Sequence, residues 1–137
     1  MTPEILARIV TARGMRDLSD AARNALAKTS DTISPAERIE QARELRQMAN
    51  AIVDLVVLGE ALGGASWEEI TQALNRRDPG SVAGEYEGAV AEWQAMPEDE
   101  RQAAAEGAEY LDAWFARHRE DIDPAVERPV GDLHNRR

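Results

Sequence analysis

The chain has no cysteine among its 137 residues, and this absence excludes three kinds of chemistry. Disulfide bonds, thiol nucleophiles and cysteine-based zinc sites all need that residue. Aromatic side chains are also scarce, at 4% of the sequence. The interior must therefore be filled by Leu, Ile, Val, Met and many Ala residues, a composition that favours closely packed helices over strands.

Positive charge and long apolar runs are also limited. The sequence has 26 acids against 16 Lys and Arg, a net charge of −10, with Lys28 as its one lysine. Such a chain repels nucleic acid and anionic membranes and suits a basic partner. The most apolar run, residues 51–58, contains Asp54 and is far too short to span a bilayer, and no signal-peptide pattern precedes it. We therefore expect a cytoplasmic protein with no membrane partner.

Capping residues and apolar spacing predict helices along most of the chain. A capping hydroxyl followed by proline begins a helix at Thr2 and again at Ser34, and Gly14 is expected to break the first of these helices. No stretch shows the alternation of a strand. The six expected helices cover about 3–13, 17–28, 35–62, 66–74, 79–93 and 97–118.

These elements predict an all-α fold. We expect a six-helix, bundle-like single domain over residues 1–120, with 35–62 as its long central helix and a C-terminal tail over 121–137. One side of the long helix is expected to face the core and carries the residues Ile39, Ala42, Leu45, Ala49, Ile52, Val56 and Gly59. In the last helix, the candidates for burial are Ala103, Ala104, Ala108, Leu111, Trp114 and Phe115.

The second half of the long helix is apolar nearly all round. A chain of this size would struggle to cover Ile52, Val53 and Val56 together. We therefore expect a homodimer, paired through the long helix or through the segment 110–115.

Residues 53–93 contain the most informative motif. Ser66 and Glu69 form a capping box for a short helix, and Asp78 with Pro79 begins the next helix after a turn. This arrangement resembles helix-turn-helix domains, both small bacterial ones and Myb/SANT-like ones in which a tryptophan opens the middle helix. The expected core positions, each at least half buried, are Trp67, Ile70, Leu74, Val82, Tyr86 and Trp93.

The resemblance implies a DNA-binding surface, but the charges of this chain argue against it. In helix-turn-helix families the third helix reads bases, and the matching positions here are Ser81, Gly84, Glu85 and Glu87. Arg76 and Arg77, in the turn, would hold phosphates. Residues 80–93 contain no Arg or Lys but three glutamates, Glu85, Glu87 and Glu92, which would repel a duplex.

Catalytic signals are sparse. His118 and His134 are the two histidines, and neither has the spacing of a metal ligand. Carboxylates at 37 and 40, and again at 106, 109 and 112, have the spacing found in helical magnesium sites, but exposed acids on solvated faces explain them better. We expect no catalytic residues, no metal site and no cofactor.

The leading functional hypothesis is a non-enzymatic regulatory or adaptor protein. It would bind a protein partner through an acidic surface formed by Glu85, Glu87 and Glu92 on the helix-turn-helix-like scaffold. One alternative is a DNA-binding transcriptional regulator that uses Arg76, Arg77 and Ser81. Another is an acidic protein that imitates DNA and inhibits a nucleic-acid-binding protein.

Overall fold

The computed structural model describes residues 1–119 and 128–134, and within these ranges the secondary structure is entirely helical. The predicted all-α class is confirmed. The helices are α1 (Pro3–Ala27), α2 (Pro35–Leu62), α3 (Trp67–Ala73), α4 (Pro79–Ala95), α5 (Glu98–Ala104), α6 (Glu109–His118) and α7 (Pro129–His134).

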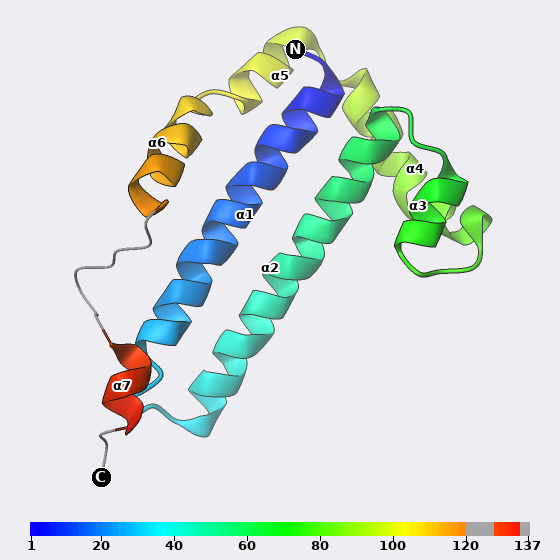
Figure 1. The fold of residues 1–137 in the computed structure, drawn as a ribbon. Coiled ribbons are helices and arrows are strands. Elements are labelled where there is room, and N and C mark those ends of the chain that lie inside the picture. The colour runs from blue at the N-terminus through cyan, green and yellow to red at the C-terminus, as the bar shows by residue number, and fades with distance from the viewer. Residues whose placement is uncertain (120–127, 135–137) are drawn as a thin grey trace.

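The two longest helices, α1 and α2, lie side by side and run in opposite directions (Figure 1). Each begins where its sequence predicts. The Thr2 hydroxyl accepts from the Ile5 amide at 3.2 Å, and the Ser34 hydroxyl accepts from the Glu37 amide at 3.1 Å. These caps satisfy amides that have no partner within the helix. The fold is therefore organised around a helical hairpin rather than around a single long helix.

The predicted break at Gly14 is wrong, because α1 continues through it as one helix of 25 residues. A Cβ atom on Gly14 would lie 3.3 Å from Cγ1 of Ile52 in α2. A glycine inside a helix costs about 1 kcal/mol relative to alanine, but here it allows α2 to approach closely. Packing along the hairpin outweighs this local preference.

The single helix predicted over 97–118 is also wrong. Gly107 has a φ of 84°, a left-handed conformation that separates α5 from α6. Arg13 of α1 donates to the carbonyl oxygen of Ala104 at 2.6 Å and to that of Glu106 at 2.9 Å. The guanidinium group thereby satisfies carbonyl groups at the end of α5, which a continuous helix would have paired internally.

The burial predicted for α2 and α6 is only partly correct. Gly59 of α2 faces α1, because a Cβ atom there would lie 3.5 Å from that of Ala7. In contrast, Ile39 and Val56 are exposed, at 62% and 40%, and so is Ala42. In the segment predicted as one helix over 97–118, Phe115 of α6 is 60% exposed. Ala103 and Ala104 are also exposed, whereas Ala108, Leu111 and Trp114 are partly buried.

The short helices α3 and α4 pack against each other and against the C-terminal half of α2. Their common core contains Val57, Ile70 and Val82, whose exposed fractions are 6%, 6% and 0%. Trp67, Leu74 and Tyr86 pack against this cluster, and Trp93 is also partly buried. The predicted core positions of residues 53–93 are thus confirmed.

The predicted C-terminal tail lies mostly outside the described residues, which resume only with Arg128 and α7. None of the described helices combines the length and apolarity that crossing a bilayer would require.

Candidate interaction surfaces on α3, α4 and α5

A capping box formed by neighbouring residues begins α3, the first helix of the candidate site. The Ser66 hydroxyl accepts from the Glu69 amide at 3.1 Å, and Glu69 Oε1 accepts in return from the Ser66 amide at 3.2 Å. Both halves of the predicted capping box are therefore formed. Gly64 precedes it with a φ of 98°, which suits glycine at the end of α2. The chain thus reverses sharply from α2 into α3.

The turn between α3 and α4 also follows the predicted chemistry. Asn75 has a φ of 57°, a left-handed conformation that asparagine tolerates better than most residues. Asp78 accepts from the Gly80 amide at 3.1 Å, and Pro79 is the first residue of α4. Asparagine therefore supplies the left-handed residue at which α3 ends.

The residues of the two rival binding hypotheses are bonded to one another. Arg76 Nη1 lies 2.8 Å from Oε2 of Glu85, and Arg76 Nη2 donates to the Ser81 hydroxyl at 3.2 Å. The hydrogen bond from Arg76 lowers the pKa of Glu85, and the same bond raises the pKa of Arg76. A phosphate at Arg76, or a basic partner at Glu85, would have to compete with this ion pair.

Three other predicted site residues stay exposed. Arg77, Glu87 and Glu92 all point to solvent, and none of them forms a hydrogen bond or ion pair with the described residues. Glu87 and Glu92 lie on α4, whereas Arg77 lies in the turn before it. The structure thus separates the six candidates into a bonded set, Arg76, Ser81 and Glu85, and an unpaired set.

A hydrogen bond from Tyr86 connects α4 to α2. Its hydroxyl donates to Oδ1 of Asp54 at 2.7 Å, across 32 residues of sequence. Burial, followed by this hydrogen bond and the nearby carboxylate charge, raises the pKa of Tyr86 to about 12. The phenol is therefore neutral at physiological pH and acts as a hydrogen-bond donor. This contact holds the exposed face of α4 in a fixed orientation.

A groove at the junction of α4 and α5 was not anticipated. Its lining includes Trp93, Met96 and Pro97, with Glu92 and Glu100 also contributing. An aromatic and apolar floor next to carboxylates can receive the stem and the charged end of a basic side chain. The signal that could have revealed it is a tryptophan within residues 79–100, a stretch with six acids and no base.

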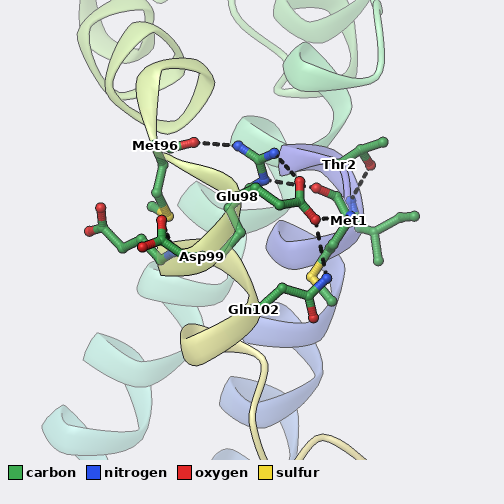
Figure 2. Close-up of polar contacts among 9 residues, drawn as sticks. Met1, Thr2, Met96, Glu98, Asp99 and Gln102 are labelled. Carbon is green, nitrogen blue, oxygen red and sulfur yellow. Dashed lines mark hydrogen bonds and ion pairs between the residues drawn. The ribbon is translucent and has the colours of Figure 1, made fainter.

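Polar contacts hold α5 at the start of α1 (Figure 2). Glu98 Oε1 accepts from the amino group of Met1 at 2.7 Å and from Gln102 at 3.2 Å. Oε2 of the same carboxylate lies 2.5 Å from Nη2 of Arg101, which also donates to the carbonyl oxygens of Met1 and Met96. The amino group, followed by Gln102 and Arg101, lowers the pKa of Glu98 to about 2. These contacts position one wall of the groove.

The described residues bring together no group of three His, Cys, Asp or Glu side chains suited to a metal ion. His118 stacks on Trp114 with ring centroids 4.7 Å apart, and its Nδ1 lies 2.7 Å from the carbonyl oxygen of Trp114. The position of this histidine is explained by packing at the end of α6. The side chain of His134 lies outside the described part of the chain.

Comparison with protein-family models, curated proteins and solved structures finds no match for this chain. The helix-turn-helix resemblance therefore stays a prediction from residues 53–93.

Proposed function

We propose that this is a non-enzymatic regulatory or adaptor protein that acts in the cytoplasm by binding a basic segment of a protein partner. The binding surface is the exposed face of α4 together with the groove at its junction with α5. Glu87 and Glu92 attract the partner, and Trp93 offers it an apolar and aromatic contact.

One observation carries this proposal. Glu85 pairs with Arg76 at 2.8 Å, whereas Glu87 and Glu92 have no partner among the described residues. The nearby groove adds Glu100 and an aromatic floor. Unpaired carboxylates on an exposed helix create a negative potential that draws and orients a cationic partner.

The alternative, a DNA-binding regulator, rests on Arg77, which is exposed and unpaired in the described structure. A duplex that approached Arg77 would meet Glu85, Glu87 and Glu92 on the next helix. Binding would need to neutralise phosphates, and this surface contributes more repulsion than attraction. A protein that imitates DNA would share the acidic surface, and its partner would be a nucleic-acid-binding protein.

A two-probe binding assay at low salt separates these functions. One probe is a labelled, lysine- and arginine-rich peptide, and the other is a labelled duplex of mixed sequence. We expect fluorescence anisotropy to detect binding of the peptide but not of the duplex. Glu87→Lys with Glu92→Lys should weaken peptide binding at least about tenfold, because attraction becomes repulsion.

A matched control is Glu40→Lys with Glu44→Lys. It makes the same change in net charge at two exposed acids of α2, away from α4. It should weaken peptide binding much less. Equal effects of the two double variants would show that net charge alone attracts the peptide, which contradicts the proposed site. Micromolar or tighter binding of wild type to duplex, abolished by Arg77→Glu, would favour the DNA-binding alternative.

A further inference from the structure

The chain exposes far more surface than a compact monomer of its mass. Its accessible surface is 9541 Å² for 15.1 kDa, whereas a folded monomer of this mass exposes about 7,100 Å². If residues 120–127 and 135–137 are counted as fully extended chain, they account for about 1,800 Å². The described residues, roughly 13.8 kDa, then expose at least about 7,700 Å², whereas a compact monomer of that smaller mass exposes about 6,600 Å², so their surplus is about 1,000 Å².

The helical hairpin of α1 and α2 carries more than half of the large apolar side chains that are exposed in the described structure. Ten large apolar side chains are exposed in the described structure, and six of them belong to α1 and α2. They are Ile5, Met15, Leu26, Ile39, Val53 and Val56.

These six side chains form one stripe on each helix. Met15 lies 10 residues after Ile5 and 11 before Leu26, and each interval is about three helical turns. In α2, Val53 lies 14 residues after Ile39, about four turns, and Val56 follows one turn later. The spacing is that of an amphipathic helix whose apolar stripe packs against another element. No such element covers these stripes in the described structure.

The two stripes lie on the same side of the hairpin. On each helix the stripe is displaced by roughly 100–120° from the residues that face the other helix, in the same rotational sense. The facing residues are Ala7 and Gly14 on α1, and Ile52 and Gly59 on α2. Because the helices run in opposite directions, an equal rotation brings both stripes to one side. In Figure 1 the other helices lie mainly beside the hairpin, α6 next to α1 and α3 next to α2.

We call this surface the open face: the six large apolar residues and the positions between them at three- and four-residue spacing. The intervening positions are Ala and Ser apart from two charged residues, Arg8 and Arg46, and Glu60 continues the stripe four residues after Val56. Arg8 lies 3.8 Å from Glu60 and 3.2 Å from Glu4 at the edge of this face, so both acids have a basic neighbour. In a chain of net charge −10, this face carries almost none of the negative charge.

We propose that the open face binds a second copy of the same chain, so that two hairpins form an antiparallel four-helix core. Two-helix layers bury their apolar stripes in this way in four-helix bundles. The surplus of at least about 1,000 Å² matches the roughly 800 Å² that each partner buries in a stable interface. A second copy also presents the same nearly uncharged face, so two chains of −10 meet where their repulsion is weakest.

This dimer is independent of the proposed binding by α4. It leaves that helix outside the interface, because α4 contacts α2 through Asp54 and Val57, each of which lies roughly 100° around the helix from its neighbour Val53 or Val56. A dimer would thus present two acidic surfaces, one on each copy.

Light scattering coupled to size-exclusion chromatography tests the interface with the full chain. We expect wild type to have twice the chain mass of 15.1 kDa at tens of micromolar. Met15→Glu with Val53→Glu should shift it to the monomer mass, because charge is introduced at two side chains that are 51% and 45% exposed in one copy. Circular dichroism should show that the variant remains helical.

A matched control is Phe115→Glu, which changes a side chain that is 60% exposed on α6. It should leave the dimer mass unchanged, as should Glu87→Lys with Glu92→Lys. If the first variant loses its helical signal, Ala22→Glu provides the test, because it alters an exposed small residue of the same stripe. A monomeric wild type, an unchanged mass for the open-face variants, or dissociation by Phe115→Glu would overturn the proposal.

Discussion

The hydrogen bond between Tyr86 of α4 and Asp54 of α2 makes the stability of the fold depend on pH. Its pKa is raised to about 12 by burial and by the hydrogen bond to Asp54, so the folded state favours the protonated phenol. The resulting stabilisation is complete below the unfolded pKa of about 10. It is lost as pH rises through the folded pKa, because deprotonation then becomes easier in the unfolded chain.

We therefore predict that wild type loses stability between about pH 10 and pH 12 more steeply than Tyr86→Phe. At neutral pH the variant should be less stable by about 1 kcal/mol, the net value of one hydrogen bond, since Asp54 is exposed and can be hydrated. Urea unfolding at several pH values measures both effects. If the free energy of unfolding falls equally steeply with pH in both proteins above about pH 10, the raised pKa of Tyr86 is contradicted.

Two glycines on the outer face of α4 have no structural requirement for glycine. A Cβ atom on Gly84 or Gly88 would meet nothing within 4 Å. Alanine also loses less backbone entropy than glycine on forming a helix. We predict that Gly84→Ala and Gly88→Ala each stabilise the fold by about 0.5–1 kcal/mol, measured by urea unfolding.

The control is Gly64→Ala, at the end of α2. Gly64 has a φ of 98°, a conformation that strains any residue with a Cβ atom, although no neighbour lies close enough to clash. This variant should be destabilised by about 1 kcal/mol. Destabilisation by Gly84→Ala as well would show that α4 is held in a different conformation from the one described.

At the scale of helices, Arg13 determines where α5 ends. It bonds the carbonyl oxygens of Ala104 and Glu106, at 2.6 and 2.9 Å, and thereby connects α1 to the α5–α6 junction. We predict that Arg13→Ala destabilises this junction by roughly 1 kcal/mol, the value of charge-assisted hydrogen bonds near a surface. Hydrogen exchange should become faster in α5 and α6.

The same experiment has an internal and an external control. Amides of α3 and α4 should keep their exchange rates, because the hydrogen bonds of Arg13 go to the α5–α6 junction. Arg43→Ala, at an exposed position of α2 with no partner in the described structure, should leave α5 and α6 unaffected. Faster exchange throughout the chain would indicate global destabilisation instead of loss of a cap.

Helix starts could be predicted from the sequence because caps involve neighbouring residues. Ser34, Ser66 and Asp78 each bond an amide two or three positions further on, so their signals are complete within a few letters. The two errors depend on distant residues. Gly14 stays helical because Ile52 packs on it, and α5 ends early with Arg13 bound to its last carbonyl groups. Neither contact is visible in a local window.

The candidate site was predictable in its composition but not in its pairing. The sequence identifies Arg76, Ser81 and Glu85 as charged or polar residues near one turn. It does not reveal that the turn brings them together, since residues five and nine positions apart meet only when α3 and α4 are folded. The groove at Trp93 was missed for a similar reason. It forms where α4 ends and α5 begins, at a change of direction that helical periodicity does not describe.

At the scale of the whole molecule, negative charge opposes compactness. With 26 acids and 16 Lys and Arg, like-charge repulsion outweighs the attraction within surface ion pairs, which individually contribute little. Salt screens such exposed charges, with a Debye length of about 30 Å at 0.01 M and about 3 Å at 1 M. Salt should therefore stabilise this protein.

We predict that the melting temperature rises as sodium chloride increases from about 0.01 M to about 0.5 M, measured by circular dichroism at constant protein concentration. Glu87→Gln with Glu92→Gln should raise the melting temperature at low salt and flatten its salt dependence, because two unpaired carboxylates are removed from an acidic helix. Glu85→Gln should lower it instead, since this carboxylate pairs with Arg76 at 2.8 Å. A melting temperature that falls with added salt would mean that ion pairs, and not repulsion, dominate the charge balance of the fold.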